Sequence, residues 1–136
     1  MQTSRTYKLL LSNQGVALFL GCHCRLAHLV RDFIPYGATL AVALAFLATL
    51  DPCDIAAEFE TQKFARSCGK QVHFVGASAR LVDAMAEIRK KLRDSAEFAT
   101  PPSVGKLYVV SLILLESAED RQLLDAYFQL VQTMNA

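Results

Sequence analysis

Two short apolar runs near the start of the chain predict a pair of strands. Residues 7–11 and 16–20 each have the length of a strand, and the polar segment between them ends in Gly15. Apolar runs joined by a short polar turn are typical of a β-hairpin. We therefore expect a hairpin over residues 7–20, with Gly21 ending its second strand.

Apolar residues at every third or fourth position predict a helix in three later segments. The first ends before Pro35, the second has Ser78 as its N-cap, and the third follows a capping pattern of Ser117 and Asp120. Residues 55–68 form a further predicted helix, with Pro52 suited to its first turn and Gly69 as its stop. The three stripes are Leu26, Leu29, Val30 and Phe33; Leu81, Met85, Ile88 and Leu92; and Leu123, Leu124, Tyr127, Phe128, Val131 and Met134.

Two longer apolar runs are compatible with either kind of element. In residues 39–46 large side chains alternate with alanine, which favours a strand covered on both faces, although alanine and leucine also favour helix. Residues 107–115 form a continuous run that is either a strand or a buried helix. Residues 72–75 are β-branched or aromatic for the most part and predict a short strand ending at Gly76. We expect 39–46 to be a buried strand between the hairpin and this short strand.

The order of these elements predicts an α/β fold with a single sheet, in which a β-hairpin is followed by alternating helices and strands. Residues 1–99 form this domain. Residues 100–136 begin with the linker-like segment 100–103 and are an extra apolar C-terminal unit, which packs on the same domain or forms an interface. An all-α bundle, with both ambiguous runs helical, is the alternative fold.

Composition and charge argue against several functional classes. The chain is 53% hydrophobic, which is too apolar for a disordered protein, and its net charge of +1 gives no basic surface for nucleic acid. The basic residues at 89–93 lie beside Asp94 and Glu97, as is typical of a solvated helix face. No apolar run reaches the roughly 20 residues of a membrane span. We expect a cytoplasmic protein.

The four cysteines are expected to be free thiols, because the cytoplasm keeps them reduced. Cys24 and His28 lie four residues apart on one helix face, but a structural zinc site needs four ligands. Cys22, Cys53 and Cys68 have no spacing that completes such a set. We therefore predict no disulfide, no metal and no cofactor.

Residues with catalytic chemistry are present without a catalytic motif. Ser78, Cys53, His73 and Asp51 could lie near one edge of the sheet, but no Gly-x-Ser-x-Gly motif accompanies them. The turn from Gly76 to Ser78 lacks the further glycines of a dinucleotide-binding loop, so it predicts at most an anion at a helix N-terminus. We expect no enzyme; a small α/β ligand-binding protein or enzyme that uses this turn is the alternative.

Several markers over residues 7–92 follow one another in the order of a known module. They are a strand ending at Gly21, a run leading into Asp51 at a helix head, a helix with Ala65-Arg66 before Gly69, and Gly76-Ala77-Ser78 opening the next helix. In this order they resemble a STAS domain, the module of sulfate transporters and anti-sigma factor antagonists. The resemblance implies a regulatory domain that docks on a protein partner and is switched by phosphorylation of a hydroxyl at the helix head.

This chain departs from that family at the regulatory site. The usual Asp-Ser-Ser/Thr-Gly reads Asp51-Pro52-Cys53-Asp54, so Cys53 stands where the phosphorylated hydroxyl is expected. The two aspartates would place fixed negative charge at a helix start, where the helix dipole favours it. The resemblance thus implies a non-phosphorylatable adaptor or a subunit of a transport complex, with its partner surface at Asp51, Pro52, Cys53, Asp54 and nearby Ser78.

The last helix offers a second candidate surface. Leu123, Tyr127, Val131 and Met134 give it a wide apolar face, which packs on the core or forms a homodimer interface. Taken together, these features predict a non-catalytic regulatory or adaptor domain that binds a protein partner. A helical assembly protein is a further alternative.

Overall fold

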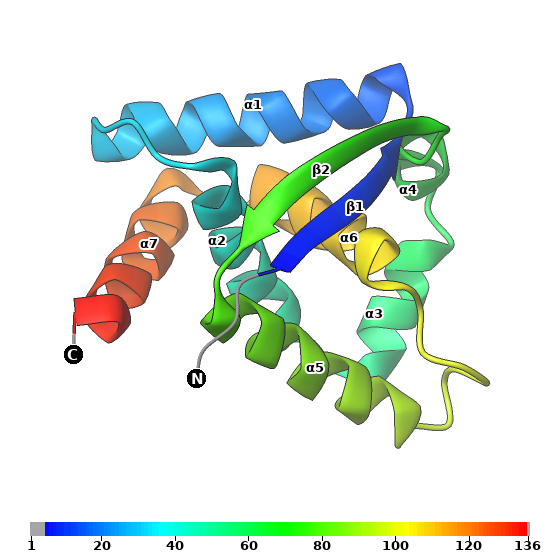
Figure 1. Ribbon diagram of the computed structural model, residues 1–136. Coiled ribbons are helices and arrows are strands. Elements are labelled where there is room, and N and C mark those ends of the chain that lie inside the picture. The colour runs from blue at the N-terminus through cyan, green and yellow to red at the C-terminus, as the bar shows by residue number, and fades with distance from the viewer. Residues whose placement is uncertain (1–4, 136) are drawn as a thin grey trace.

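The computed structural model describes residues 5–135, with side chains placed up to residue 132. These residues form one two-stranded sheet and seven helices around a common core (Figure 1). The elements in order are β1 (Arg5–Leu11), α1 (Asn13–Val30), α2 (Tyr36–Ala48), α3 (Pro52–Phe59), α4 (Gln62–Ser67), β2 (Gln71–Ala77), α5 (Ala79–Arg93), α6 (Val104–Ser117) and α7 (Asp120–Asn135).

The first strand pairs with a segment far along the chain. β1 and β2 are antiparallel, with Tyr7 opposite Val75 and Leu11 opposite Gln71. Alternate residues of β1, namely Tyr7, Leu9 and Leu11, are buried on the inner face of the sheet. The strands predicted at 7–11 and 72–75 are therefore confirmed, and both lie within longer strands.

The predicted hairpin is wrong, because its second arm belongs to α1. Ser12 does not begin a turn; its hydroxyl caps the helix by accepting a hydrogen bond from the Gly15 amide at 3.1 Å. The buried residues that follow, Leu18, Cys22 and Leu26, recur at helical spacing and pack toward the core. A longer amphipathic helix therefore forms here in place of a local hairpin, and β1 pairs with β2.

The strand predicted at 39–46 is also wrong, since α2 runs through it without interruption. Alanine and leucine are the strongest helix formers, and their alternation suits a helix as well as a strand. The large residues Leu40, Leu44 and Leu47 lie on one helical face and are buried, and the helix packs against α6. The second and third strands used for the STAS resemblance are therefore both helical.

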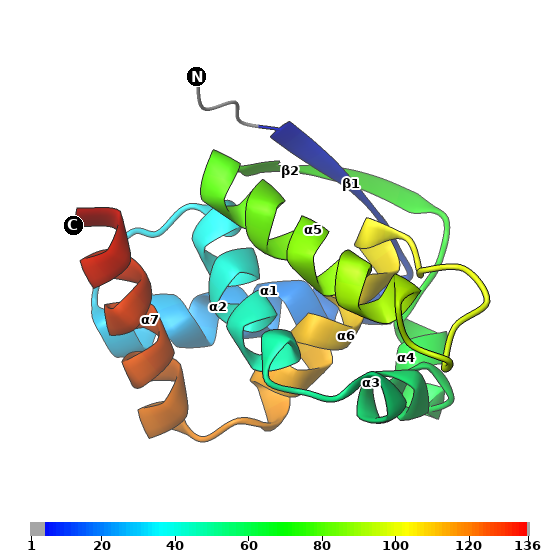
Figure 2. The ribbon, with the colours of Figure 1, turned by 90° about the horizontal axis from the view of Figure 1, so that it is seen from below.

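α6 lies at the centre of the core. The helix contacts β1, α1 and α2 (Figure 2). Its fully buried side chains include Leu107, Tyr108, Val110, Leu112 and Leu115. This arrangement explains why its sequence is apolar on every side. Residues 107–115, which the sequence left open between strand and helix, form a buried helix. The C-terminal segment therefore contributes the central helix of the core.

The predicted helix ends are partly correct. Pro52 begins α3, and Ser78 caps α5 by accepting a hydrogen bond from the Leu81 amide at 3.2 Å, both as expected. The helix predicted over 55–68 is two helices, because α3 ends at Phe59 and Thr61 caps the start of α4. Ser117 is no cap for α7; it is the last residue of α6 and donates to the Ile113 carbonyl.

The first helix ends before Phe33. Arg31 adopts a left-handed conformation with φ of 57° and terminates α1, which leaves Phe33 fully exposed in the following loop. The mixed α/β class is thus correct in its broad sense, with a sheet of two strands in the described residues and far more helix than expected. Among these helices, none is by itself both long and apolar enough to cross a membrane.

Candidate functional site: a groove between three helices

A large apolar groove opens between α2, α5 and α7. Its volume is about 710 Å³, within the range of small-molecule sites. Alanines make up much of its surface, and we call it the alanine groove. They are Ala38, Ala41, Ala45 and Ala48 of α2, Ala77 of β2, Ala84 of α5 and Ala126 of α7.

The floor of the alanine groove is the face of α2 opposite its large side chains. Its four alanines recur at intervals of three or four residues, so they form one stripe about 15 Å long. Leu40 and Leu47 point the other way and are fully buried. The alternation that resembled a strand does not map onto these two faces, because Ala43 is fully buried and Leu44 borders the groove.

The walls are α5 and α7, which both contact α2 and lie on opposite sides of it in Figure 2. Leu81 and Ile88 on α5 and Leu130 on α7 line the groove with larger apolar side chains. Leu81 and Ile88 belong to the stripe predicted from the sequence, which the structure buries together with Met85 and Leu92. The site is therefore built on helices that are fixed by core packing.

The polar side chains of the groove come from the start of α5 and from α7. Ser78 and Arg80 lie at the start of α5, and Gln129 lies on α7. The N-terminus of α2 is held close to this end of β2, because a side-chain carbon on Gly37 would fall 2.4 Å from the Gly76 carbonyl oxygen. The Gly76–Ala77–Ser78 turn singled out in the sequence thus lines the groove.

At the far end of the groove, Lys91 of α5 is hydrogen-bonded to the C-terminal end of α2. The Lys91 ammonium donates to the Leu50 carbonyl at 2.9 Å and to the Ala48 carbonyl at 3.4 Å. Ala48 is the last residue of α2 and Leu50 lies just beyond it, where a positive charge is favoured by the helix dipole. Lys91 was expected on a solvated face, and it instead ties α5 to the C-terminal end of the groove floor.

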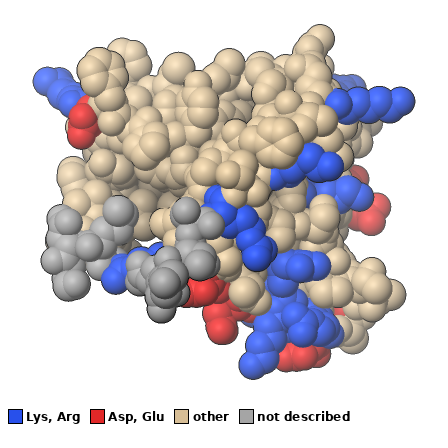
Figure 3. Space-filling model, viewed as in Figure 1, with Lys and Arg blue, Asp and Glu red and all other residues tan. Residues whose placement is uncertain are grey.

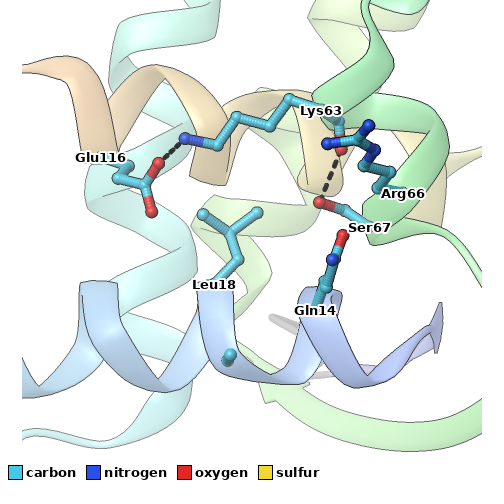
Figure 4. A pocket seen from close by; sticks show the side chains of 7 residues that line it. Gln14, Leu18, Lys63, Arg66, Ser67 and Glu116 are labelled. Carbon is cyan, nitrogen blue, oxygen red and sulfur yellow. Dashed lines mark hydrogen bonds and ion pairs between the residues drawn. The ribbon is translucent and has the colours of Figure 1, made fainter.

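A smaller cavity of about 460 Å³ lies between α1 and α4 (Figure 4). Two of its three charged residues are paired, since the Lys63 ammonium forms an ion pair with Glu116. Ser67 donates to the Lys63 carbonyl at 2.8 Å, and Ser12 donates to the Arg66 carbonyl. These contacts join α4 to α1 and α6, so this cavity is a structural junction and the alanine groove is the candidate site.

The structure separates the residues of the predicted partner surface. Asp51, Pro52, Cys53 and Asp54 form the head of α3, with Cys53 and Asp54 exposed. These four residues follow Leu50, whose carbonyl accepts a hydrogen bond from Lys91 in the C-terminal half of α5. Ser78 instead caps the N-terminus of α5. Thirteen helical residues correspond to about 20 Å. A single contact at the head of α3 does not include Ser78, and docking at residues 51–54 stays a prediction.

The predicted apolar face of α7 is divided between core and surface. Leu123 is fully buried, Tyr127 and Val131 are half-buried, and the side chain of Met134 lies outside the described part. Phe128 is instead the exposed aromatic residue of this helix, at 53%. Leu123 is therefore a core residue and contributes nothing to an interface.

The thiols differ in their surroundings. Cys22 is buried and donates to the Leu112 carbonyl at 3.4 Å, and burial raises its pKa to about 11. Burial also raises the pKa of Cys68, while Cys24 and Cys53 are exposed, and all four are free in the structure. Within residues 5–135 no three His, Cys, Asp or Glu side chains are grouped as a metal site.

Comparison with protein-family models, with curated proteins and with solved structures returned no match for this chain. The site therefore has to be interpreted from its own geometry. Sequence reasoning missed the groove because its alanines look like the covered face of a strand. The signal that was available is their spacing at 38, 41, 45 and 48, which fits one helical face.

Proposed function

We propose that this protein is a non-catalytic binding protein that holds an amphiphilic molecule in the alanine groove. The observation that carries the proposal is the groove itself, about 710 Å³ of largely apolar surface with few polar side chains. Natural ligand sites have this composition, since apolar walls supply the affinity and a few polar groups fix the orientation.

The apolar walls favour an aliphatic or flat hydrocarbon body. Alanine side chains on all three helices leave room along the floor, and Leu81, Ile88 and Leu130 offer larger contact surfaces beside it. Burying a hydrocarbon there gains about 25 cal/mol for each Å² removed from water. A strongly polar guest would lose hydrogen bonds to water along these walls without replacing them.

The polar side chains favour an anionic head group. Arg80 brings a positive charge to the groove, and the start of the 15-residue helix α5 adds the positive end of its dipole. Arg80 and Gln129 each take part in a contact of their own, so it is the positive charge of Arg80 that would favour a carboxylate nearby. A long-chain carboxylate is the simplest molecule that combines these features.

The test is displacement of a fluorescent fatty-acid probe, followed by titration with a long-chain carboxylate and the alcohol of equal length. We expect saturable binding with a preference for the carboxylate. Ala45→Leu, which fills the groove, should weaken binding about tenfold or more, and Arg80→Gln should weaken the carboxylate more than the alcohol. Ala57→Leu on the exposed surface of α3 is the matched control. Binding that is unchanged by Ala45→Leu, or absent altogether, would overturn the proposal.

A helix of a protein partner is the second candidate for the same groove. The alanine spacing on α2 favours it, because small residues let the backbone of a second helix approach closely. Native mass spectrometry of the purified protein, with extraction of bound lipids, separates the two. A stoichiometric small molecule supports the first candidate. Displacement of the probe by short amphipathic helical peptides, with no preference for the carboxylate over the alcohol, supports the second.

A further inference from the structure

The sheet leaves one strand edge without the protection that edge strands usually have. Within residues 5–135 β2 pairs with β1 alone, whereas β1 also has an isolated bridge from Leu11 to Cys68. Each strand still has an outer edge along most of its length. The outer edge of β1 lies near α6: a side-chain carbon on Gly105 would fall 2.9 Å from the Lys8 carbonyl oxygen. β2 has no such cover over its first half, because Gln71, Val72, His73 and Phe74 are all exposed.

The exposed part of β2 is apolar on the outer face of the sheet. Val72 is 49% exposed and Phe74 65%, and Leu10 of β1, directly opposite Val72, is 46% exposed. Figure 3 views this face and shows few charged side chains over its upper part, while Lys and Arg gather at its lower right. Natural edge strands are commonly protected by lysine, proline or a bulge, and the strand Gln71–Ala77 contains no lysine or proline.

We propose that two copies of this chain associate through the free edges of β2, forming a continuous four-stranded antiparallel sheet. A two-fold axis at His73 would place Val72 of one copy opposite Phe74 of the other. The strand contains no Asp, Glu, Lys or Arg, so like charges do not meet across the axis. The two-fold axis would form the Val72–Phe74 pair twice, and this repeated pairing of a β-branched with an aromatic residue is what favours a second copy over an unrelated strand.

The same pairing would extend the outer apolar surface. Leu10, Val72 and Phe74 of both copies would lie on one face of the four-stranded sheet and cover part of one another. The contact is small compared with obligate dimers, so we expect a reversible dimer with a dissociation constant on the order of tens of micromolar. This association is independent of the alanine groove, to which β2 contributes only its Gly76 end.

Sedimentation velocity tests the proposal over a range of about 5 to about 300 µM, which brackets the expected constant. The wild type should shift from monomer to dimer across this range. Phe74→Lys should abolish the shift, because the lysine would lie against the apolar side chain opposite it. Phe128→Lys, at a similarly exposed aromatic residue on α7, is the matched control and should leave it unchanged. Circular dichroism confirms that both variants are folded.

A cross-link tests the axis directly. In a background of Cys24→Ser and Cys53→Ser, His73→Cys should form a disulfide-linked dimer on mild oxidation, since paired residues at a two-fold axis bring their Cβ atoms close. Ala86→Cys on the exposed face of α5 is the control and should remain monomeric. A wild type that stays monomeric throughout, or a dimer that Phe128→Lys removes and Phe74→Lys does not, would overturn the proposal.

Discussion

The two most apolar helices of this protein, α2 and α6, differ in how completely they are covered. α6 is surrounded by β1, α1 and α2, and its residues from Leu107 to Ile113 are all buried. α2 buries one side against α6, while its alanines line an open groove. The comparison shows that apolar sequence alone does not indicate full burial. On α2 the side left open is lined mainly by alanines, although Leu44 also borders the groove and Ala43 is buried on the packed side.

The size distribution has a physical reason. Large side chains in α6 fill the space among three neighbours, and interiors are packed too densely to leave such residues uncovered. On α2 the alanines Ala45 and Ala48 are exposed, which costs little because an alanine offers little apolar surface to water. A helix can therefore be apolar throughout and still carry a binding surface.

The largest expected effect comes from a cavity in α6. Leu112→Ala should lower the free energy of unfolding by about 2–5 kcal/mol, because Leu112 is fully buried and the helix around it cannot collapse into the space. Urea denaturation followed by circular dichroism measures the change. Leu114→Ala, at a half-buried position of the same helix, should cost clearly less. Equal losses would show that α6 is not enclosed as described.

Overpacking distinguishes the two sides of α2. Ala43 is fully buried, so Ala43→Leu should destabilise the protein by about 1–3 kcal/mol. Ala45→Leu, two residues further along and facing the groove, should change stability by less than about 0.5 kcal/mol. Thermal unfolding of the two variants side by side is the measurement. A large loss for Ala45→Leu would mean that the groove is closed in solution.

A buried hydroxyl in α6 allows a stabilising change. Tyr108 is fully buried, and its hydroxyl forms no hydrogen bond of good geometry among the described residues. Burial, and then the neighbouring Tyr7 hydroxyl, raise the pKa of Tyr108. Its ring lies 5.2 Å from that of Tyr7. Tyr108→Phe should remove an unsatisfied polar group and raise the free energy of unfolding by about 1 kcal/mol. Chemical denaturation tests this, with Tyr7→Phe beside it; a loss of stability would reveal a partner for the hydroxyl.

The smallest effect concerns the polar contact that holds the start of α2. His23 of α1 is hydrogen-bonded to the buried Thr39 through Nδ1 and Oγ1 at 2.7 Å, and burial lowers its pKa. The unfolded chain therefore binds the proton more readily, so stability should fall as the pH drops below about 6.5 toward the folded-state pKa. His23→Gln should flatten this dependence, measured as unfolding midpoints at several pH values. His28→Gln, at an exposed position, should leave the slope as in the wild type.

The elements that could be predicted from the sequence are those with local signals. Ser78 and Pro52 mark helix starts by their own chemistry, and the stripe from Leu81 to Leu92 defines α5 without help from other segments. The strand at 72–75 follows from its β-branched and aromatic residues. In each case the local preference and the tertiary environment agree.

The wrong secondary-structure predictions arose where the local sequence is compatible with both a strand and a helix. Residues 16–20 are apolar enough for a strand, but Ser12 caps a helix there and β1 pairs 60 residues away, at Gln71. Large residues and alanines alternate with a period of two in residues 39–46, as in a strand. Whether this segment forms a strand or a helix depends on its packing against α6, which covers the leucines. The alanine groove needed the same information, since three helices from distant segments form it. The signals that the sequence offered for it were the Gly76–Ala77–Ser78 turn and the helical spacing of the alanines at 38, 41, 45 and 48.

The order of the chain also has a consequence for its synthesis. β1 is made first but lacks its partner until β2 has been translated, and the central helix α6 follows only after residue 103. The apolar faces of α1 and α2 therefore leave the ribosome before the helix that buries them exists. Contacts so distant in sequence slow folding and prolong the exposure of apolar surface. For most of its translation the chain therefore exposes apolar surface that α6 covers only later, and a chain that terminates before α6 lacks the centre of its core.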